Sequence, residues 1–276
     1  MLVARLLHGA DVEAVCDLLG RCYRWLGDRG EYSREQALSL ARTRAAPAVL
    51  REEARSETCF VAVVDSRIVG VSSVGGNELT RLYVAPEHHR SGVGSLLFRM
   101  AERTVRFRGF DELVLGTTAS AVPFYVAQGV QETGVKSHGL PGFEDRQVVL
   151  MSKTPAAEAA PFRRLQVRYS GKLGKPVGVF GACHHLRRAG RLSLEDDRLF
   201  SDVDRWFKDN LPEPPFYADG NSLKAITWFK DSATEMLART GPLTDILRRY
   251  GVEYDLVESR SVGHIIYEDA WQVGVI

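Results

Sequence analysis

The chain has 276 residues, of which 45% are hydrophobic and 26% charged, and its formal net charge is +1. This profile is typical of a globular protein of one large domain or two ordinary ones, and no net field or basic aromatic cluster indicates nucleic-acid or membrane binding. No run of 18 apolar residues and no signal-peptide layout is present, so we expect a cytoplasmic protein without a bilayer span.

Segments with helical and strand-like periodicity alternate through the first part of the chain. Residues 9–26 carry apolar side chains at helical spacing after Asp11, a candidate N-cap, and residues 27–33 read as a loop. The other expected elements are a helical stretch at 34–54 with a break near Pro47, two strands within 59–76 around Asp65-Ser66, a strand at 78–84, a helix at 93–106, a strand at 112–118 and a helix at 121–128.

The segment 152–161 is rich in small residues, contains proline and lacks periodicity, so it is the candidate linker. We therefore expect two domains, 1–153 and 162–276, the second a smaller α+β unit of unknown role. The elements expected beyond the linker are two strands around a Gly-Lys turn within 163–183, helices near 182–190 and 194–210, a loop at 212–220, a strand at 225–229, a helix at 231–250 and strands at 252–258 and 264–275.

The cysteines do not have the spacing of a zinc site or a disulfide framework. Cys183, His184 and His185 are consecutive, so on a helix or strand they point in different directions. We interpret them as one buried thiol and two partly exposed imidazoles, and we expect no metal. The four cysteines are Cys16, Cys22, Cys59 and Cys183.

Two glycines, Gly92 and Gly94, stand where a helix is expected to begin after a strand and a turn. The free backbone N–H groups of a helix's first turn attract phosphate, and glycine removes the Cβ atom that would block close approach. Arg90 and two neighbouring histidines add donors. The stretch therefore predicts a pyrophosphate cradle, although taken alone it equally fits a glycine-capped helix. It lacks the Gly-Lys-Ser/Thr of a Walker A loop and the third glycine of a dinucleotide fingerprint.

The surrounding segment, RLYVAPEHHRSGVGSLLFRMAERT, resembles the signature of the GNAT N-acetyltransferase superfamily. In that family a strand leads into a Gln/Arg-x-x-Gly-x-Gly/Ala loop and a helix. His89-Arg90-Ser91-Gly92-Val93-Gly94 matches the loop, with His89 where Gln or Arg is usual. The resemblance covers about residues 1–153 and implies an α/β (α+β) fold with a mixed sheet flanked by helices. Residues 162–276 lie outside it.

A second segment, ASAVPFYVAQGV at 119–130, resembles the family's Ala-x-x-Phe-Tyr-x-x-x-Gly-Phe pattern. It departs from the pattern only in Val130, which replaces the final Phe. Two motifs in the family's order, about thirty residues apart, make the resemblance specific. The matching residues are Ala121, Phe124, Tyr125 and Gly129.

The resemblance implies a transferase that moves an acetyl group from acetyl-CoA, its co-substrate, to a primary amine by direct attack. It places the pantetheine arm along the backbone of Leu82-Tyr83-Val84 and the pyrophosphate on the glycine loop. The acceptor is then a small-molecule or peptide amine. The residues expected to hold acetyl-CoA are Leu82, Tyr83, Val84, His89, Arg90, Ser91, Gly92, Val93, Gly94 and Ser95.

Acyl transfer needs a neutral amine, a polarised carbonyl and a proton for the leaving thiolate. Tyr125 matches the family's tyrosine near the cofactor sulfur and is the candidate acid; otherwise it is an aromatic residue packed on the sheet. Glu78, at the start of its strand, is the candidate base, directly or through water; otherwise it is a solvated strand-end residue. Thr118 stands where family members often carry Asn, so we assign it no contact.

The loop between the first two helices commonly shapes the acceptor pocket in this family. Asp28, Glu31 and Tyr32 lie in it, where they would meet a cationic amine; the alternative is a plain exposed loop. The acceptor itself is not named by the sequence.

Two rival interpretations concern the chain as a whole. In the first, the fold keeps acyl-CoA but no longer transfers the acetyl group, and the second domain carries an output. In the second, the activity is retained and residues 162–276 serve oligomerisation or a protein partner through the aromatic-rich segment 200–217. Ordinary core packing explains the aromatic residues of that segment equally well, and the oligomeric state stays open.

Overall fold

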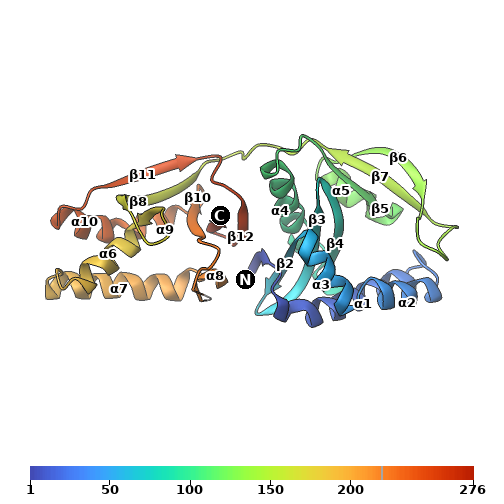
Figure 1. Cartoon of the computed structure of the whole chain (residues 1–276), viewed down its shortest axis with the longest axis horizontal. Helices are drawn as coiled ribbons and strands as arrows, with labels where there is room; N and C mark the ends of the chain where they lie inside the picture. The colour runs from blue at the N-terminus through green and yellow to red at the C-terminus, as the bar shows by residue number, and fades with distance from the viewer. Residues whose placement is uncertain (219) are drawn as a thin grey trace. The chain divides into compact units, whose positions relative to one another are not determined.

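The computed structural model describes residues 1–218 and 220–276, which form two compact units, 1–156 and 157–276 (Figure 1). The expected α/β class, with a mixed sheet flanked by helices, is confirmed. None of the helices within the described ranges has the length and apolar character needed to cross a membrane.

The first unit is built on a seven-stranded sheet in the order β1-β2-β3-β4-β5-β7-β6. Neighbouring strands are antiparallel except β4 and β5, which are parallel. The strands are β1 (Leu2–Leu6), β2 (Thr58–Val64), β3 (Arg67–Gly75), β4 (Glu78–Val84), β5 (Leu113–Thr117), β6 (Gln131–Ser137) and β7 (Gln147–Lys153).

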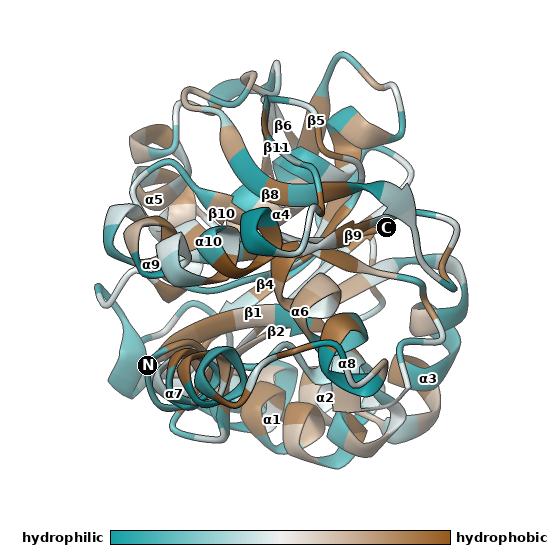
Figure 2. Ribbon diagram, turned by 90° about the vertical axis from the view of Figure 1, so that its left-hand side faces the viewer, coloured by the Kyte–Doolittle hydropathy of each residue, from teal (hydrophilic) through white to brown (hydrophobic). Residues whose placement is uncertain are grey.

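Helices cover both faces of this sheet. Adjacent side chains of a strand point to opposite sides, so one strand packs against helices on both faces. On β3, Gly70 lies against helix α4, while its neighbour Val71 packs into the cluster formed by α1 and α2. Figure 2 shows hydrophobic residues along β1 and both hydrophobic and hydrophilic residues around α1. The helices are α1 (Val12–Asp28), α2 (Arg34–Thr43), α3 (Pro47–Ser56), α4 (Val93–Phe107) and α5 (Val122–Ala127), with short 3-10 turns η1 (Gly9–Asp11), η2 (Pro86–His88) and η3 (Ala119–Ala121).

Local sequence signals account for most of these boundaries. Pro47 opens α3 and divides the helical stretch as expected, and Ser33 caps α2 by accepting a hydrogen bond from the backbone N–H of Gln36. Asp65 and Ser66, with φ of 47° and 64°, form the turn between β2 and β3. The elements expected at 78–84, 93–106, 112–118 and 121–128 are confirmed to within one or two residues.

Three strands of the first unit, β1, β6 and β7, are not predicted by the sequence. Every residue of β6 is exposed, so its sequence has no alternation of apolar and polar side chains. Asp11 occupies the N-cap position of α1, but its carboxylate does not cap the helix and instead binds Arg5 at 2.6 and 2.9 Å. β7 continues to Lys153, so residues 152 and 153 belong to the sheet and the connecting segment is 154–161.

The second unit has an antiparallel sheet in the order β11-β8-β10-β13-β12, with β9 paired to β8. An apolar cluster joins β8 to α6, α7 and α10. The elements are β8 (Phe162–Ser170), β9 (Pro176–Gly178), α6 (Val179–Arg188), α7 (Leu194–Asn210), α8 (Pro215–Ala218), β10 (Ile226–Lys230), α9 (Thr234–Arg239), α10 (Gly241–Arg249), β11 (Tyr254–Ser259), β12 (Ile265–Glu268) and β13 (Gln272–Val275).

Three expectations for this unit are corrected. The helix expected at 231–250 is two helices, because Pro242 at the start of α10 has no N–H to continue the first. The strand expected at 264–275 is a hairpin, whose turn is held by the Asp269 carboxylate accepting from the N–H groups of Trp271 and Gln272. The loop expected at 212–220 contains α8, and α6 begins at Val179, earlier than expected, which shortens the preceding strand.

The Cys-His-His run lies on α6 with its side chains apart. Cys183 is fully buried in the core, His184 packs edge-on against Phe200, and His185 stacks on Tyr169. The aromatic residues Phe207 and Phe216 of segment 200–217 are also buried, in agreement with ordinary core packing.

Candidate active site

The parallel strands β4 and β5 pair only at their beginnings. The paired residues are Glu78 with Val114 and Leu79 with Leu115. At the next position, Thr80, the register between β3 and β4 shifts, which marks a β-bulge. A bulge bends its strand and ends regular pairing. β4 therefore leaves β5 at Thr80, and its edge beyond that point is open.

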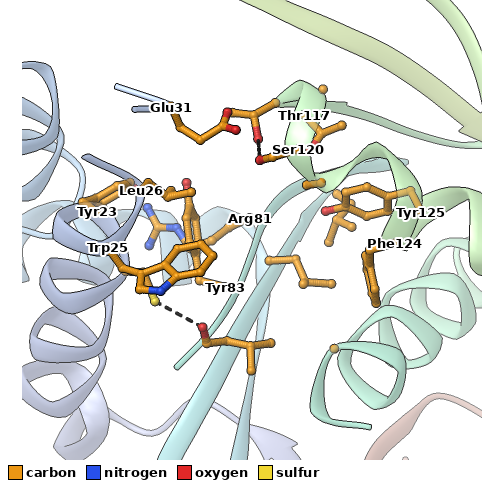
Figure 3. Close-up of a pocket in the computed structure, with 18 of the residues that line it drawn as sticks. Tyr23, Trp25, Leu26, Glu31, Arg81, Tyr83, Thr117, Ser120, Phe124 and Tyr125 are labelled. Carbon is orange, nitrogen blue, oxygen red and sulfur yellow. Dashed lines mark hydrogen bonds between the residues drawn. The ribbon is translucent and has the colours of Figure 1, made fainter. Parts of the chain in front are cut away.

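A cavity of about 1020 Å³ lies at this opening (Figure 3). Its walls come from α1 and the following loop on one side, from β4, and from β5, η3 and α5 on the other side. The first turn of α4 and the loop before it also line the cavity, as do the end of α2 with Arg44, the end of β6 with the segment after it, and Val148 of β7. Among the residues that the structure describes, those that line the cavity all belong to the first unit.

The glycine loop adopts a conformation that favours glycine. Arg90 and Gly92 have φ of 61° and 86°, in the left-handed region, and Gly92 is the N-cap of α4. The first helical bond runs from the Leu96 N–H to the Gly92 carbonyl, at 3.0 Å. The N–H groups of Val93, Gly94 and Ser95 precede it and have no intrahelical acceptor. This end of α4 thus offers backbone donors beside the cavity.

The predicted cofactor residues of the loop divide into two groups. His89, Arg90, Gly92, Gly94 and Ser95 line the cavity. Ser91 and Val93 do not line it. The Ser91 hydroxyl donates to the His88 carbonyl at 2.6 Å, and Val93 is buried in the core at 1% exposure.

His89 has a defined role in the loop although it replaces the family's Gln or Arg. Its ring packs edge-on against Trp25, with centroids 4.9 Å apart, and Nε2 lies 3.1 Å from the Val84 carbonyl. The Cys22 thiol also donates to that carbonyl. The Val84 carbonyl, one of the backbone groups expected to bind the pantetheine arm, is therefore already hydrogen-bonded within the protein. Leu82 and Tyr83 line the cavity along the open edge of β4.

Tyr125 faces the cavity from α5 and is only 6% exposed. Its ring packs edge-on against Phe98 and Phe124, and its hydroxyl bonds to the side chain of Thr117. Burial raises the pKa of the Tyr125 phenol above its usual value. The phenol is therefore protonated at neutral pH, the state a proton donor requires. Figure 3 shows it across the cavity from Tyr23 and Tyr83.

The candidate base and the acceptor loop are only partly brought together. Glu78 is exposed and lines the cavity, and as the first residue of β4 it begins the short pairing with β5. Glu31 and Tyr32 also line it, but Asp28 is exposed at the end of α1 and does not. The roles of these residues remain predictions. Thr118 lines the cavity with its hydroxyl 3.2 Å from that of Ser120.

Sequence reasoning missed the basic side chains of the cavity. It took Glu78, Thr80, Leu82 and Val84 as one face of β4. The bulge at Thr80 breaks that alternation, because Leu79 and Leu82 pack in the same apolar cluster, and Arg81 lies near Tyr23 of α1. Lys136 and His138 come from β6 and the residue after its end, and β6 was not predicted. The missed residues are Tyr23, Arg44, Arg81, Lys136 and His138.

Comparison with known proteins agrees with this geometry. Residues 29–139 match the family described as acetyltransferase (GNAT) domain. A GCN5-related N-acetyltransferase from Rhodopseudomonas palustris has a TM-score of 0.51 and 20% identity, over 55% of this chain and 94% of that one. This similarity shows the fold alone.

Two further solved structures are similar at lower TM-scores. The PaiA N-acetyltransferase of Thermoplasma acidophilum, solved with coenzyme A, has a TM-score of 0.46 and 24% identity, over 56% of this chain and 99% of that one. A ribosomal-protein-alanine N-acetyltransferase from Brucella melitensis has a TM-score of 0.44 and 20% identity, over 55% and 98%. No curated protein sequence matches the chain.

Proposed function

The chain belongs to the GNAT superfamily through its acetyltransferase domain at residues 29–139, and from this premise we propose that it transfers an acetyl group from acetyl-CoA to a primary amine. The observation that carries the proposal is the opening of β4 from β5 beside the first turn of α4, with Tyr125 facing it.

The residues at this opening fit acetyl-CoA. The left-handed backbone at Arg90 and Gly92 and the free N–H groups at the start of α4 suit a pyrophosphate. The edge of β4 at Leu82 and Tyr83 suits an extended amide-containing arm. Acetyl-CoA supplies the acyl thioester, and the chain supplies orientation and proton transfer.

In the proposed reaction, the neutral amine attacks the thioester carbonyl, a C–N bond forms and the C–S bond breaks. The Tyr125 hydroxyl donates a proton to the leaving thiolate. Glu78 lies four residues before Leu82, where the pantetheine arm is proposed to bind, which is about 13 Å along the strand. Glu78 therefore takes the proton that the amine loses through water and not by direct contact. Residues held near a reacting centre lower the barrier mainly by positioning.

A turnover screen tests the proposal. Purified protein is incubated with acetyl-CoA and amino acids, aminoglycosides, polyamines or peptides, and release of the CoA thiol and acetylation of the amine are measured together. Acetylated product with equal thiol release is the expected result. Tight acetyl-CoA binding without acetylation of any amine contradicts transfer and supports a module that only binds acyl-CoA.

A further inference from the structure

Positively charged side chains outnumber carboxylates in the lining of the cavity. Among the described residues, five arginine and lysine side chains line the cavity but only two carboxylates do. Arg90 belongs to the glycine loop, which leaves four cations on the other walls. The five cations are Arg29, Arg44, Arg81, Arg90 and Lys136, and the two carboxylates are Glu31 and Glu78.

Arg81 is the most buried of these cations, at 4% exposure. Its Nη2 donates to the Arg44 carbonyl at 3.1 Å and lies 2.8 Å from Glu53. Its Nη1 is buried and has no hydrogen-bond partner among the described residues. A buried cationic donor without a partner is costly, so its retention beside a cavity calls for a ligand that satisfies it.

One carboxylate, Glu53, serves two of the cations. The Arg44 guanidinium lies 4.0 Å from Glu53, the same group that pairs with Arg81. The pKa of Glu53 is raised by burial, and the two arginines oppose that rise. Two arginines share one carboxylate, so one positive charge in this part of the cavity lining is not neutralised by Glu53.

Lys136 adds to this surplus from β6. It lines the same cavity as Arg44 and has no ion pair among the described residues. Two tyrosine hydroxyls, of Tyr23 and Tyr83, bond to each other beside Arg81. Arg44, Arg81 and Lys136 are called the basic wall below.

We propose that the acceptor is an amine that also carries an anionic group, a carboxylate or a phosphate, which binds at the basic wall. This inference rests on the proposed acetyl transfer. The amine end then lies toward Tyr125, which stands across the cavity from Arg81 (Figure 3). A polycation meets like charges at the wall and is disfavoured. The expected acceptor, an unidentified small-molecule or peptide amine, is thereby narrowed to a zwitterion.

Matched amines test the inference. Each α-amino acid is compared with its decarboxylated amine, such as phenylalanine with phenethylamine, and O-phosphoethanolamine is compared with ethanolamine; spermidine represents polycations. We expect kcat/KM to be at least tenfold higher for the anionic member of a pair, which corresponds to about 1.4 kcal/mol. The carboxylate and phosphate pairs show which anion the wall prefers.

The variant Arg44→Gln locates the effect. It should reduce the preference for the anionic member by about tenfold, mostly through KM, because a charge-assisted contact is lost. Arg42→Gln is the matched control, since Arg42 is exposed in the last turn of α2, two residues before the C-cap residue Arg44, and does not line the cavity. An equal loss in both variants, or in neither, overturns the assignment to the basic wall.

The remaining outcomes separate the inference from the proposed function. If the kcat/KM for ethanolamine, phenethylamine or spermidine equals that for the anionic amines, the inference is wrong and acetyl transfer stands. If no amine is acetylated, the proposed function is wrong, and calorimetry of the same amines with the CoA-bound protein decides the wall separately. Equal affinity for phenylalanine and phenethylamine there overturns the anion site, whereas tighter binding of phenylalanine supports it.

Discussion

A Cβ atom on Gly94 would lie 3.1 Å from the ring of Phe124. The two segments that resemble family motifs therefore meet at this glycine, one on α4 and the other on α5. Contacts this close require the neighbour to move, so a side chain at Gly94 disturbs the packing of α5 as well as the cavity. Gly92 has no atom within 4 Å of its Cβ position and is the cleaner site for testing the cradle.

Gly92→Val should weaken acetyl-CoA binding by tenfold or more, about 1.4 kcal/mol, because the branched Cβ stands at the free N–H groups of α4. The left-handed φ of 86° adds strain of about 1–3 kcal/mol to the folded state. Gly109→Val is the matched control, since Gly109 has φ of 81°, equally open surroundings and no place in the cavity.

Calorimetry with acetyl-CoA and a thermal melt of each variant separate the two effects. Both variants should melt at a lower temperature than the parent, and only Gly92→Val should lose affinity. An unchanged affinity in folded Gly92→Val would refute the cradle.

Tyr125→Phe should lower kcat and leave acetyl-CoA affinity unchanged. The ring contacts with Phe98 and Phe124 survive the substitution, while the hydroxyl bonded to Thr117 is lost. A general acid typically contributes about 10²–10⁴-fold. Rates are measured where chemistry limits turnover, with calorimetry as the control for binding. A kcat within about twofold of the parent removes Tyr125 from the mechanism and leaves water to protonate the thiolate.

The sequence was sufficient for the framework of the cofactor side. Gly92, Gly94 and the apolar face of α4 are local signals, because a helix start and its free N–H groups depend on consecutive residues. The order strand, loop, helix, strand, helix followed from periodicity, and the structure has it at 78–127. Tyr125 could be matched for the same reason, since its motif is contiguous.

The acceptor side could not be derived in that way. Arg81 lies beside Glu53 and Arg44, which are 28 and 37 residues away in the sequence. The fully exposed strand β6, which contributes Lys136, has no hydrophobic alternation to mark it. The bulge at Thr80 depends on pairing with β3 and is invisible to a single strand's sequence. Contacts between distant segments therefore decide this half of the cavity.

Stability should fall in alkaline solution from about pH 9. Burial raises the pKa of Cys183 from 9.0 to about 12 and does the same for Cys22. An unfolded thiol releases its proton near pH 9 while the folded one keeps it, so the stabilisation is fully present below pH 9 and is lost as pH rises toward 12. Each thiol contributes a slope of at most about 1.4 kcal/mol per pH unit.

Cys183→Ala tests this slope by chemical denaturation at several pH values. The variant is less stable at every pH because the core loses volume, so slopes are compared and not absolute free energies. Below pH 8, where the Cys183 thiol of the parent is protonated in both the folded and the unfolded state, the slopes of the two proteins should coincide. Between pH 9 and 10 the variant's decline should be shallower; equal slopes there would mean that Cys183 ionises as readily in the folded state as in the unfolded one.

The fragment 1–157 should fold and bind acetyl-CoA. Both motifs lie within it, as do the described residues that line the cavity, and it keeps the Ala156 carbonyl that accepts a hydrogen bond from Arg106. A cut after residue 153 would remove that acceptor. A unit of this size buries enough surface to be stable alone. We expect acetyl-CoA affinity within about threefold of the full chain, measured by calorimetry on fragment that gives a cooperative melt.

The same fragment shows what residues 157–276 contribute. If they only mediate assembly, kcat and KM for the acceptor should persist in the fragment, and gel filtration should show a smaller species than expected from mass ratio alone. If they help to bind the acceptor, acceptor KM should rise while acetyl-CoA affinity stays the same. Loss of acetyl-CoA binding in a folded 1–157 fragment contradicts the prediction of two independent domains, because the second unit would then have to complete the cofactor site.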